Sequence, residues 1–402
     1  MRIGVFTMIV VSLVFLLSVV NSFWIGRLFR QPLRRRIWFA YSVLTLLGAA
    51  AYLGLRSTGA PEGWAVLNFI YYFGPFWTVL QLLLLLAWPF SFMAAWLQRR
   101  WSVPEEAESD IQIKSSLNPA MTRRTFLSTA AVLPPVAMTG INTVGVLDAE
   151  FRAVLRRVDF AYPDLPPALD GLKIAHMTDV HIGPYVSARD VNKLVNLLRS
   201  ASPDLLAITG DFVDDVSMLP GVMDTMKPFL DDLPLGAWFC MGNHEHLRGA
   251  APIRSILQQS GIHILDNQHQ RLPFGGSYFA IAGVDYPIGS STAVRPETAK
   301  KYVEEACLDI PRQDFTLLMA HHPDFLPPAF ERRISLTLAG HTHGGQVGWG
   351  DRSALQFLYP YMRGVYRDEQ SFGFVSSGAG HWLPFRLNCP PEVSLITLKR
   401  VT

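Results

Sequence analysis

The stretch Leu172-Lys173-Ile174-Ala175-His176-Met177-Thr178-Asp179-Val180-His181 decides the fold, because it joins a short apolar run to an acid and a histidine. Short apolar runs that contain β-branched residues are typical of buried strands. Five more runs of this kind follow along the chain: Leu205 to Thr209, Ala237 to Met241, Tyr278 to Val284, Thr316 to Ala320 and Ser335 to Ala339. Each of the six runs is predicted to be a strand.

Helical patterns lie between these runs. Ser187 precedes a segment with Asp190 three residues later, as in a helix capping box, and apolar residues then recur on one face. Pro296-Glu297 has the form of a second helix start, and that helix should continue through Val303 to Cys307. Strands that alternate with helices predict an α/β domain over residues 150–402.

Potential metal ligands follow most of the predicted strands. They stand in five groups, which are Asp179-Val180-His181, Gly210-Asp211, Gly242-Asn243-His244-Glu245, His321-His322-Pro323 and Gly340-His341-Thr342-His343. Sites in open α/β sheets form beyond the carboxyl ends of the strands, so these groups should converge. Asp, Asn and His without a thiolate suit Mn²⁺, Zn²⁺ or Fe. Asp211 could bridge two such ions, and a metal pair can clamp a phosphoryl group and lower the pKa of a bridging water to give hydroxide.

The five groups, in this order, resemble the calcineurin-like metallophosphoesterase superfamily over residues 168–400. Gly340-His341-Thr342-His343-Gly344-Gly345-Gln346 and Pro390-Pro391-Glu392-Val393 are similar to a bacterial membrane-associated subgroup. Some members of that subgroup carry twin-arginine signals, and others resemble lipid A pathway pyrophosphatases. The resemblance implies an α/β/β/α sandwich, in which two packed mixed sheets are flanked by helices.

The resemblance also implies a role for each residue and two divalent metal ions as cofactors. The first metal would be held by Asp179, His181 and His343, and the second by Asn243, His321 and His341. Asp211 would bridge the two ions. His244 would be the catalytic histidine that stabilises the transition state or protonates the leaving oxygen. Glu245 stands where many members have Asp, and we expect it to orient His244.

The N-terminal part has the composition of a membrane anchor. The first 100 residues contain nine Arg, no Lys and one acid, Glu62. Three stretches without charge, Ile3 to Gly26, Ile37 to Leu55 and Gly63 to Gln98, are each long enough to cross a bilayer as a helix. We therefore expect residues 1–100 to form an anchor of three transmembrane helices. The third stretch contains two prolines, so it could be one kinked helix or a helix with a re-entrant piece.

The arginines predict the orientation of this anchor. They cluster at residues 27–36 and again at 99–100, and the positive-inside rule places residues 27–36 and 99–124 in the cytoplasm. Residues 101–124 are polar and are predicted to be a cytoplasmic linker. Thr122-Arg123-Arg124-Thr125-Phe126-Leu127 resembles a twin-arginine export signal, so residues 125–147 could be such a signal or a fourth transmembrane helix. Both alternatives put the 150–402 domain outside the cytoplasm; an interfacial segment would leave it inside.

Two substrate classes are disfavoured by the sequence. Protein serine/threonine phosphatases of the superfamily have an Asp-Arg-Gly after the second group, whereas Asp211 is followed by Phe212-Val213. Nucleic acid is not an expected partner, because the net charge is only +2 and no basic run with interleaved aromatics is present. A phosphodiester or pyrophosphate at a plasma or inner membrane remains, such as a lipid headgroup or an envelope polymer.

Three alternatives to this function stay open. A UDP-2,3-diacylglucosamine pyrophosphatase-like hydrolase of the lipid A pathway would need access from the cytoplasm, against the predicted orientation. A non-catalytic membrane scaffold or metal sensor would tolerate degraded ligand positions, and the sequence retains every one. A transporter-like membrane half is the third, and the absence of charge within the stretches favours an anchor instead.

Overall fold

A computed structural model describes residues 2–29, 31–58, 65–101, 123–287, 294–349 and 352–401. The chain divides into two compact units, Met1–Val146 and Leu147–Thr402. The second unit therefore begins three residues before the position expected from the sequence. Most of the predicted linker, 102–122, lies outside the described residues.

The first unit is helical. Its helices cover the four uncharged stretches and are α1 (Arg2–Arg27), α2 (Leu33–Thr58), α3 (Ala65–Trp101) and α5 (Arg123–Phe151). The third stretch is one helix, because α3 runs through both Pro75 and Pro89 without interruption. Buried hydrogen bonds join three of these helices: the Asn21 amide donates to Gln81 Oε1 over 2.9 Å, and the Tyr41 hydroxyl donates to the same oxygen over 2.6 Å.

Two helices among the described residues are long and apolar enough to cross a membrane, judged by length and composition. They are Tyr72–Arg100 within α3 and Phe126–Glu150 within α5. Helix α1 runs over 26 residues, but its side chains are described only from Val11 onward, and the apolar part Val11–Arg27 is by itself shorter than a span requires. Helix α2 starts with three consecutive arginines, Arg34 to Arg36, and does not meet the same criterion. The described residues thus support two candidate spans, fewer than the three or four expected.

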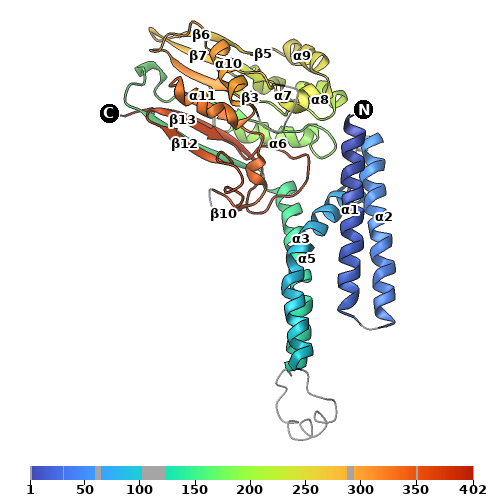
Figure 1. The fold of residues 1–402 in the computed structure, drawn as a ribbon. Helices are drawn as coiled ribbons and strands as arrows, with labels where there is room; N and C mark the ends of the chain where they lie inside the picture. The colour runs from blue at the N-terminus through green and yellow to red at the C-terminus, as the bar shows by residue number, and fades with distance from the viewer. Residues whose placement is uncertain are drawn as a thin grey trace. The chain divides into compact units, whose positions relative to one another are not determined.

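The second unit contains two six-stranded sheets (Figure 1). The first has the order β1 (Val154–Tyr162), β14 (Glu392–Arg400), β2 (Lys173–Met177), β3 (Leu205–Thr209), β4 (Ala237–Cys240), β5 (Ile262–Ile264). The second has the order β12 (Gly364–Asp368), β13 (Ser371–Val375), β9 (Leu336–Ala339), β8 (Phe315–Met319), β7 (Ser277–Gly283), β6 (Gln268–Phe274). Parallel and antiparallel pairs occur in both, so both sheets are mixed.

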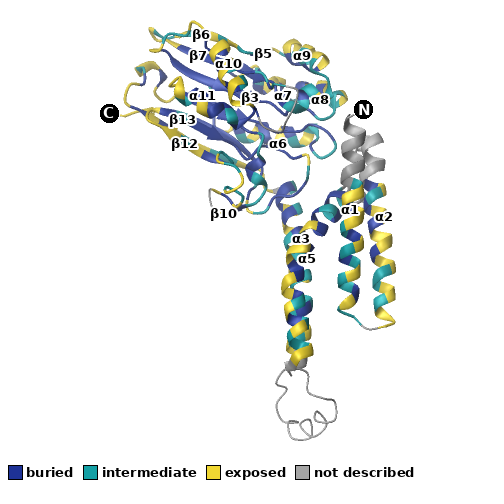
Figure 2. Cartoon of the chain, in the orientation of Figure 1, coloured by how far each residue is buried: buried dark blue, intermediate teal, exposed yellow. Residues whose placement is uncertain are grey.

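Three apolar cores hold the layers together. The core between the sheets combines side chains from both, such as Ile174 and Leu205 of the first and Ile281 and Leu317 of the second. A second core packs α6 (Ala188–Arg199), α7 (Leu219–Leu230) and α9 (Ala250–Gln259) on the first sheet. The third packs α10 (Pro296–Ala306) and α11 (Leu326–Glu331) on the second sheet. The central strands β2, β3, β8 and β9 are buried along most of their length (Figure 2), and the predicted α/β/β/α sandwich is confirmed.

All six predicted strands are present, as β2, β3, β4, β7, β8 and β9, with ends that differ by at most one residue. The helix after Ser187 is α6, and its capping box is formed: the Ser187 backbone N–H and hydroxyl donate to Asp190 Oδ2 over 3.1 and 2.7 Å. The helix that opens at Pro296 is α10. These elements bring the carboxyl ends of β2, β3, β4, β8 and β9 toward one region.

Candidate metal centre

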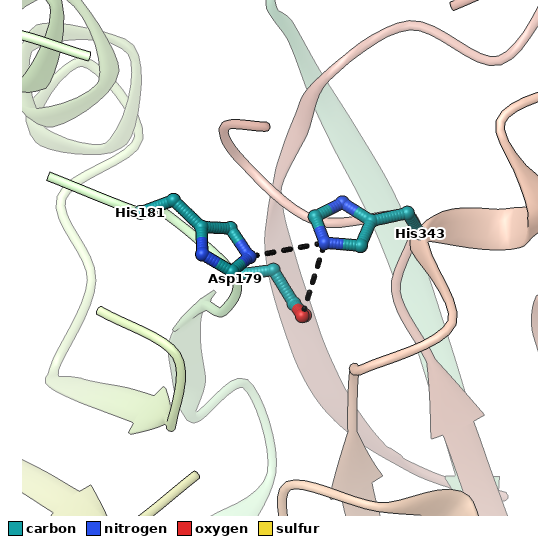
Figure 3. A group of neighbouring side chains, drawn as sticks. All are labelled: Asp179, His181 and His343. Carbon is teal, nitrogen blue, oxygen red and sulfur yellow. Dashed lines mark hydrogen bonds and ion pairs between the residues drawn. The ribbon is translucent and has the colours of Figure 1, made fainter. Parts of the chain in front are cut away.

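The predicted ligands converge in two neighbouring groups. The first group is Asp179, His181 and His343, whose ligand atoms all lie within 4.8 Å of one another. Figure 3 shows the two imidazole rings approaching from separate segments of the chain, with the carboxylate beside them. The Nε2 atoms of His181 and His343 are 3.1 Å apart, and His343 Nε2 is 3.5 Å from Asp179 Oδ1. All three side chains are buried.

The second group is Asp211, His321 and His341, again with ligand atoms within 4.8 Å. His321 Nε2 is 3.2 Å from Asp211 Oδ2 and 3.1 Å from His341 Nδ1. Asn243 belongs to the same group, because its Oδ1 lies 3.1 Å from His321 Nε2 and from His341 Nδ1. The two groups together thus take side chains from five strand ends, and the ligand atoms of each group lie close enough to hold one ion.

Asp211 links the two groups. Its Oδ2 lies 3.2 Å from His321 Nε2 in the second group and 3.9 Å from His181 Nε2 in the first. Burial raises the pKa of this carboxyl, but His321 and His244 outweigh that effect and hold the pKa well below its usual range. Asp211 is therefore ionised, with one oxygen facing nitrogen atoms of both groups.

The donor set fits a cation. His321 Nδ1 lies 2.8 Å from the Thr209 carbonyl oxygen, which accepts a hydrogen bond from it and leaves Nε2 to face acceptor atoms. Burial lowers the pKa of His321, but Asp211 more than offsets this and raises it to about 10. The surroundings of His321 Nε2 therefore stabilise a positive charge. A divalent metal ion bound by His, Asp and Asn donors would supply that charge.

The backbone around these ligands is unusual. Left-handed φ values occur at Asp179 (53°), His181 (55°), Asp211 (49°), His341 (69°) and His343 (50°). Non-glycine residues visit this region uncommonly, at a cost of order 1–3 kcal/mol each. Such strain persists only where the surrounding structure imposes it and is concentrated at functional sites. Here it turns consecutive side chains toward one point at the ends of the strands.

His244 lies at the edge of the cluster and is held by Asp214. Its Nδ1 is 2.5 Å from Asp214 Oδ1, its Nε2 is 3.8 Å from Asp211 Oδ2, and its side chain retains 18% exposure. Burial lowers the pKa of His244, but the two aspartates outweigh burial and raise it to about 9. Arg248 also donates to Asp214, over 3.1 Å. Asp214 lies three residues after Asp211 in the sequence, but no sequence pattern predicted that it would contact His244.

Glu245 does not orient His244, in contrast to the expectation from the sequence. Its carboxylate is fully buried and accepts hydrogen bonds from the backbone N–H groups of Asp211, Phe212, Val213 and Gly242, at 2.7 to 3.1 Å. The longer side chain reaches across to the neighbouring β3 loop and also accepts from Gly242 on its own loop. Glu245 therefore ties the loop after β3 to the loop after β4, and Asp214 is the partner of the His244 imidazole.

Two glycines allow the ligand loops to approach closely. A Cβ atom on Gly242 would lie 2.3 Å from Asp211 Oδ1, and one on Gly340 would lie 2.2 Å from Asp179 Oδ2. Gly242 has an ordinary extended backbone, with φ −103°. Gly242 therefore matters because it has no side chain that would collide with Asp211. Gly210, with φ 74°, matters because its backbone adopts a left-handed conformation in the turn after β3.

Arg386 is a further residue of the site that the sequence does not reveal. It is completely buried and donates to the carbonyl oxygens of His343 (3.0 Å), Ser377 (2.6 Å) and Gly380 (2.6 Å). Its Nη2 also lies 2.8 Å from His343 Nδ1. The guanidinium thus fixes the His343 ring so that Nε2 faces Asp179. An isolated arginine in a loop carries no sequence signal for such a contact.

Three of the histidines that the sequence left without a ligand role lie as follows. His322, next to His321, accepts from the Asp324 backbone N–H through Nδ1 over 3.1 Å, and its ring centroid is 4.3 Å from that of His341. His176 is buried within β2 and lies 2.8 Å from the Thr209 hydroxyl. His246 Nε2 is 2.8 Å from the Asp285 carboxylate. Each of these three rings thus has a partner outside the proposed ligand set.

Comparison with known families agrees with this geometry. Residues 172–345 match the calcineurin-like phosphoesterase family profile. A Danio rerio protein named "transmembrane protein with metallophosphoesterase domain" is 28% identical over 297 residues, which cover 71% of this chain and 66% of that protein. The chain thus spans just under two thirds of this relative. An uncharacterized metallophosphoesterase of Bacillus subtilis is 28% identical over 244 residues, covering 58% and 82% of the two chains.

Among solved structures, a 5'-nucleotidase precursor from Thermus thermophilus is similar with 18% identity and a TM-score of 0.35. The similarity covers 53% of this chain and 49% of that one.

Proposed function

We propose that the chain is a membrane-anchored hydrolase of phosphodiester or phosphoanhydride bonds that uses two divalent metal ions, because residues 172–345 match the calcineurin-like phosphoesterase family. The observation that carries the proposal is the position of Asp211 between the two ligand groups, within 3.9 Å of a histidine nitrogen of each. A carboxylate in this position suits a pair of ions and has no comparable use in a single-ion site.

The assignment of ligands follows the two groups. Asp179, His181 and His343 would hold one ion, Asn243, His321 and His341 would hold the other, and Asp211 would be shared between the two groups. When bound, the ions would supply Lewis-acid activation of the phosphoryl group and of the attacking water. Manganese, zinc and iron all suit these donors.

His244 is the proton donor in this proposal. Its contact with Asp214 anchors one ring nitrogen, while the other faces the ligand cluster at a position that solvent reaches. A pKa of about 9 keeps the imidazole protonated near neutral pH, and a protonated ring can give a proton to a leaving oxygen. Asp214 and Arg248 act as positioning residues, and Glu245 supports the loops that carry Asp211 and Asn243.

Membrane anchoring is supported by two candidate spans, Tyr72–Arg100 and Phe126–Glu150, and by relatives that are named transmembrane proteins. We propose a multi-pass anchor in a plasma or inner membrane with the domain outside the cytoplasm, in line with the distribution of arginines. The tether favours a substrate that is itself part of the membrane or the envelope, such as a lipid headgroup or a polymer.

The proposed function is tested with the full chain in detergent, stripped of metal and then supplied with Mn²⁺. We expect hydrolysis of bis(p-nitrophenyl) phosphate to depend on added metal, and Asp211→Asn to reduce the rate at least ~100-fold because the link between the ions is lost. His244→Ala should lower the rate by about 10²–10⁴-fold, the usual contribution of a general acid, without preventing metal binding.

Matched controls separate the outcomes. His263→Ala removes an exposed histidine outside the cluster and should leave the rate unchanged. An Asp211→Asn variant that hydrolyses the diester at the wild-type rate would refute the two-ion site. Wild-type protein that binds Mn²⁺ but hydrolyses neither this diester nor p-nitrophenyl phosphate would instead favour a scaffold or metal sensor.

A further inference from the structure

The most exposed large apolar side chains described in the second unit belong to one loop. Trp349 is 84% exposed, Phe357 79% and Leu358 65%. We call residues 347–349 and 352–358 the rim loop. Large aromatic groups seldom face water to this extent in soluble domains, and an apolar surface of this kind marks a contact with a partner or a membrane.

The rim loop is ordered, so this exposure is built into the fold. Strand β10 (Gly348–Trp349) pairs with β11 (Arg352–Ser353), which places exposed Arg352 opposite Trp349. The Ala354 backbone N–H donates to the Val347 carbonyl over 2.8 Å and closes the loop at its base. Leu358 N–H donates to the Leu355 carbonyl over 2.9 Å and forms a turn that carries Phe357.

The rim loop lies close to residues that neighbour the metal ligands, both at its middle and just after its C-terminal end. A Cβ atom on Gly345, two residues after His343, would be 2.9 Å from Ser353 Oγ and 3.3 Å from Leu355 Cβ. At the other end the Tyr359 hydroxyl donates to the Asp324 carboxylate. The Tyr359 ring centroid is 6.1 Å from that of His322, the neighbour of His321. The loop therefore forms part of the rim of the site.

The chain enters the second unit at the same edge. Gly348 N–H donates to the Leu387 carbonyl over 2.9 Å, and Val154 N–H donates to the Pro391 carbonyl over 2.9 Å. The rim loop and the start of β1 thus attach to the two ends of one short segment, 387–391. The candidate span Phe126–Glu150 ends four residues before Val154, a distance of at most about 14 Å along an extended chain.

From this placement we propose that the rim loop docks into the lipid–water interface of the membrane. Trp349, Phe357 and Leu358 would enter the boundary between headgroups and acyl chains, where tryptophan is favoured, and Arg352 would contact lipid phosphates. Docking would hold the metal site at headgroup level. The substrate class that follows, a phosphoester headgroup of a membrane lipid, rests on the proposed function; the docking itself does not.

The experiment exploits the burial of all three native cysteines, Cys240, Cys307 and Cys389. Trp349→Cys and, separately, Phe357→Cys are labelled with a polarity-sensitive fluorophore in the full chain. The protein is reconstituted in vesicles of phosphatidylethanolamine and phosphatidylglycerol that contain a lipid with a nitroxide near the headgroup. We expect a blue-shifted emission at both positions and a loss of emission caused by the nitroxide.

The matched control is Leu308→Cys with the same label. Leu308 is 63% exposed, nearly as much as Leu358, but it follows α10, which Figure 1 shows well away from β10 within this unit. Its emission should not respond to the nitroxide. A Trp349→Ser/Phe357→Ser variant should hydrolyse soluble bis(p-nitrophenyl) phosphate at the wild-type rate, because neither side chain is part of the ligand set.

The outcomes separate the two proposals. Labels at 349 and 357 that the nitroxide does not quench overturn membrane docking, including the case in which emission shifts only as protein concentration rises, which indicates contact between copies of the chain. Quenched labels in a protein that hydrolyses no phosphoester would support docking and refute the enzyme. Equal quenching at 308 would also overturn docking, since the contact would then not be specific to the rim loop.

Discussion

His244 and Glu245 are adjacent in sequence, yet their side chains serve different parts of the site. The His244 ring turns toward Asp211 and Asp214, while Glu245 accepts four backbone N–H bonds from the two loops around it. The length of the Glu245 side chain thus allows its carboxylate to reach both loops. The sequence motif identifies His244 and Glu245 as residues of the site. The role of each side chain is seen only from its contacts in the folded protein.

His176 provides a prediction about pH at the residue scale. Burial lowers its pKa from 6.5 to about 3, so between these values the unfolded chain binds a proton that the folded protein does not. Stability should therefore fall as the pH drops from 6.5 toward 3. His176→Gln can keep the contact with the Thr209 hydroxyl but cannot be protonated. The drop in Tm between pH 7.5 and pH 5 should be smaller in this variant.

The comparison for His176 is His263→Gln, which removes an exposed histidine and should leave the wild-type pH dependence of Tm intact. Thermal unfolding of the full chain in detergent at a fixed Mn²⁺ concentration provides the measurement. If His176→Gln loses as much stability on acidification as the wild type, His176 is not the source of the pH dependence.

At the scale of elements, the loops after β3 and β4 are packed and hydrogen-bonded to each other. Glu245 joins them, and Gly242 lies so close to Asp211 that a Cβ atom would be 2.3 Å from Oδ1. We predict that Gly242→Ala displaces the Asp211 carboxylate, weakens Mn²⁺ binding at least ~10-fold and destabilises the unit by about 1–3 kcal/mol, the usual cost of overpacking. Calorimetric titration with Mn²⁺ and thermal unfolding measure the two effects.

Gly221→Ala is the matched control for this prediction. Gly221 lies within α7, and a Cβ atom there would meet nothing within 4 Å. Alanine in a helix is favoured over glycine by roughly 0.5–1 kcal/mol, so this variant should be as stable as the wild type or more stable, with unchanged Mn²⁺ affinity. A Gly242→Ala variant that matches it in both measurements would show that the loops can separate at little cost.

The strands differ in how far the sequence predicts them. Strands β2, β3 and β4 are short buried runs, and their composition identifies them. Strand β1 (Val154–Tyr162) is half exposed and contains Arg156, Arg157 and Asp159, so no apolar run reveals it. It forms because it pairs in parallel with β14, more than 200 residues later. Pairing over that distance is a property of the folded chain.

At the scale of the whole molecule, the predicted orientation of the anchor remains to be tested. Alkaline phosphatase, which is active only outside the cytoplasm, can be fused after Thr402 in a bacterial host. The arginine distribution predicts an active fusion. If residues 125–147 act as a twin-arginine signal, Arg123→Lys/Arg124→Lys should abolish that activity, whereas a conventional fourth helix would tolerate the change.

A fluorescent protein that matures only inside the cell, fused at the same position, gives the complementary measurement. A fluorescent fusion together with an inactive phosphatase fusion would place the domain inside. That result would contradict the arginine argument and would favour a hydrolase of the lipid A pathway type, whose substrate is reached from the cytoplasm.

The sequence by itself determined which residues stand at the ends of the buried strands, because short apolar runs and the acids, amides and histidines after them are local features of the chain. These features predicted an α/β domain with ligand groups at the ends of its strands, and the resemblance to the metallophosphoesterase superfamily added the sandwich and a role for each of the nine residues that we propose for the site. Only the tertiary structure assigned Asp214 to His244, Arg386 to His343 and Glu245 to the backbone of the β3 loop. These partners are 30, 43 and 33 residues apart, and such contacts depend on how loops from different strands pack, which no local pattern encodes.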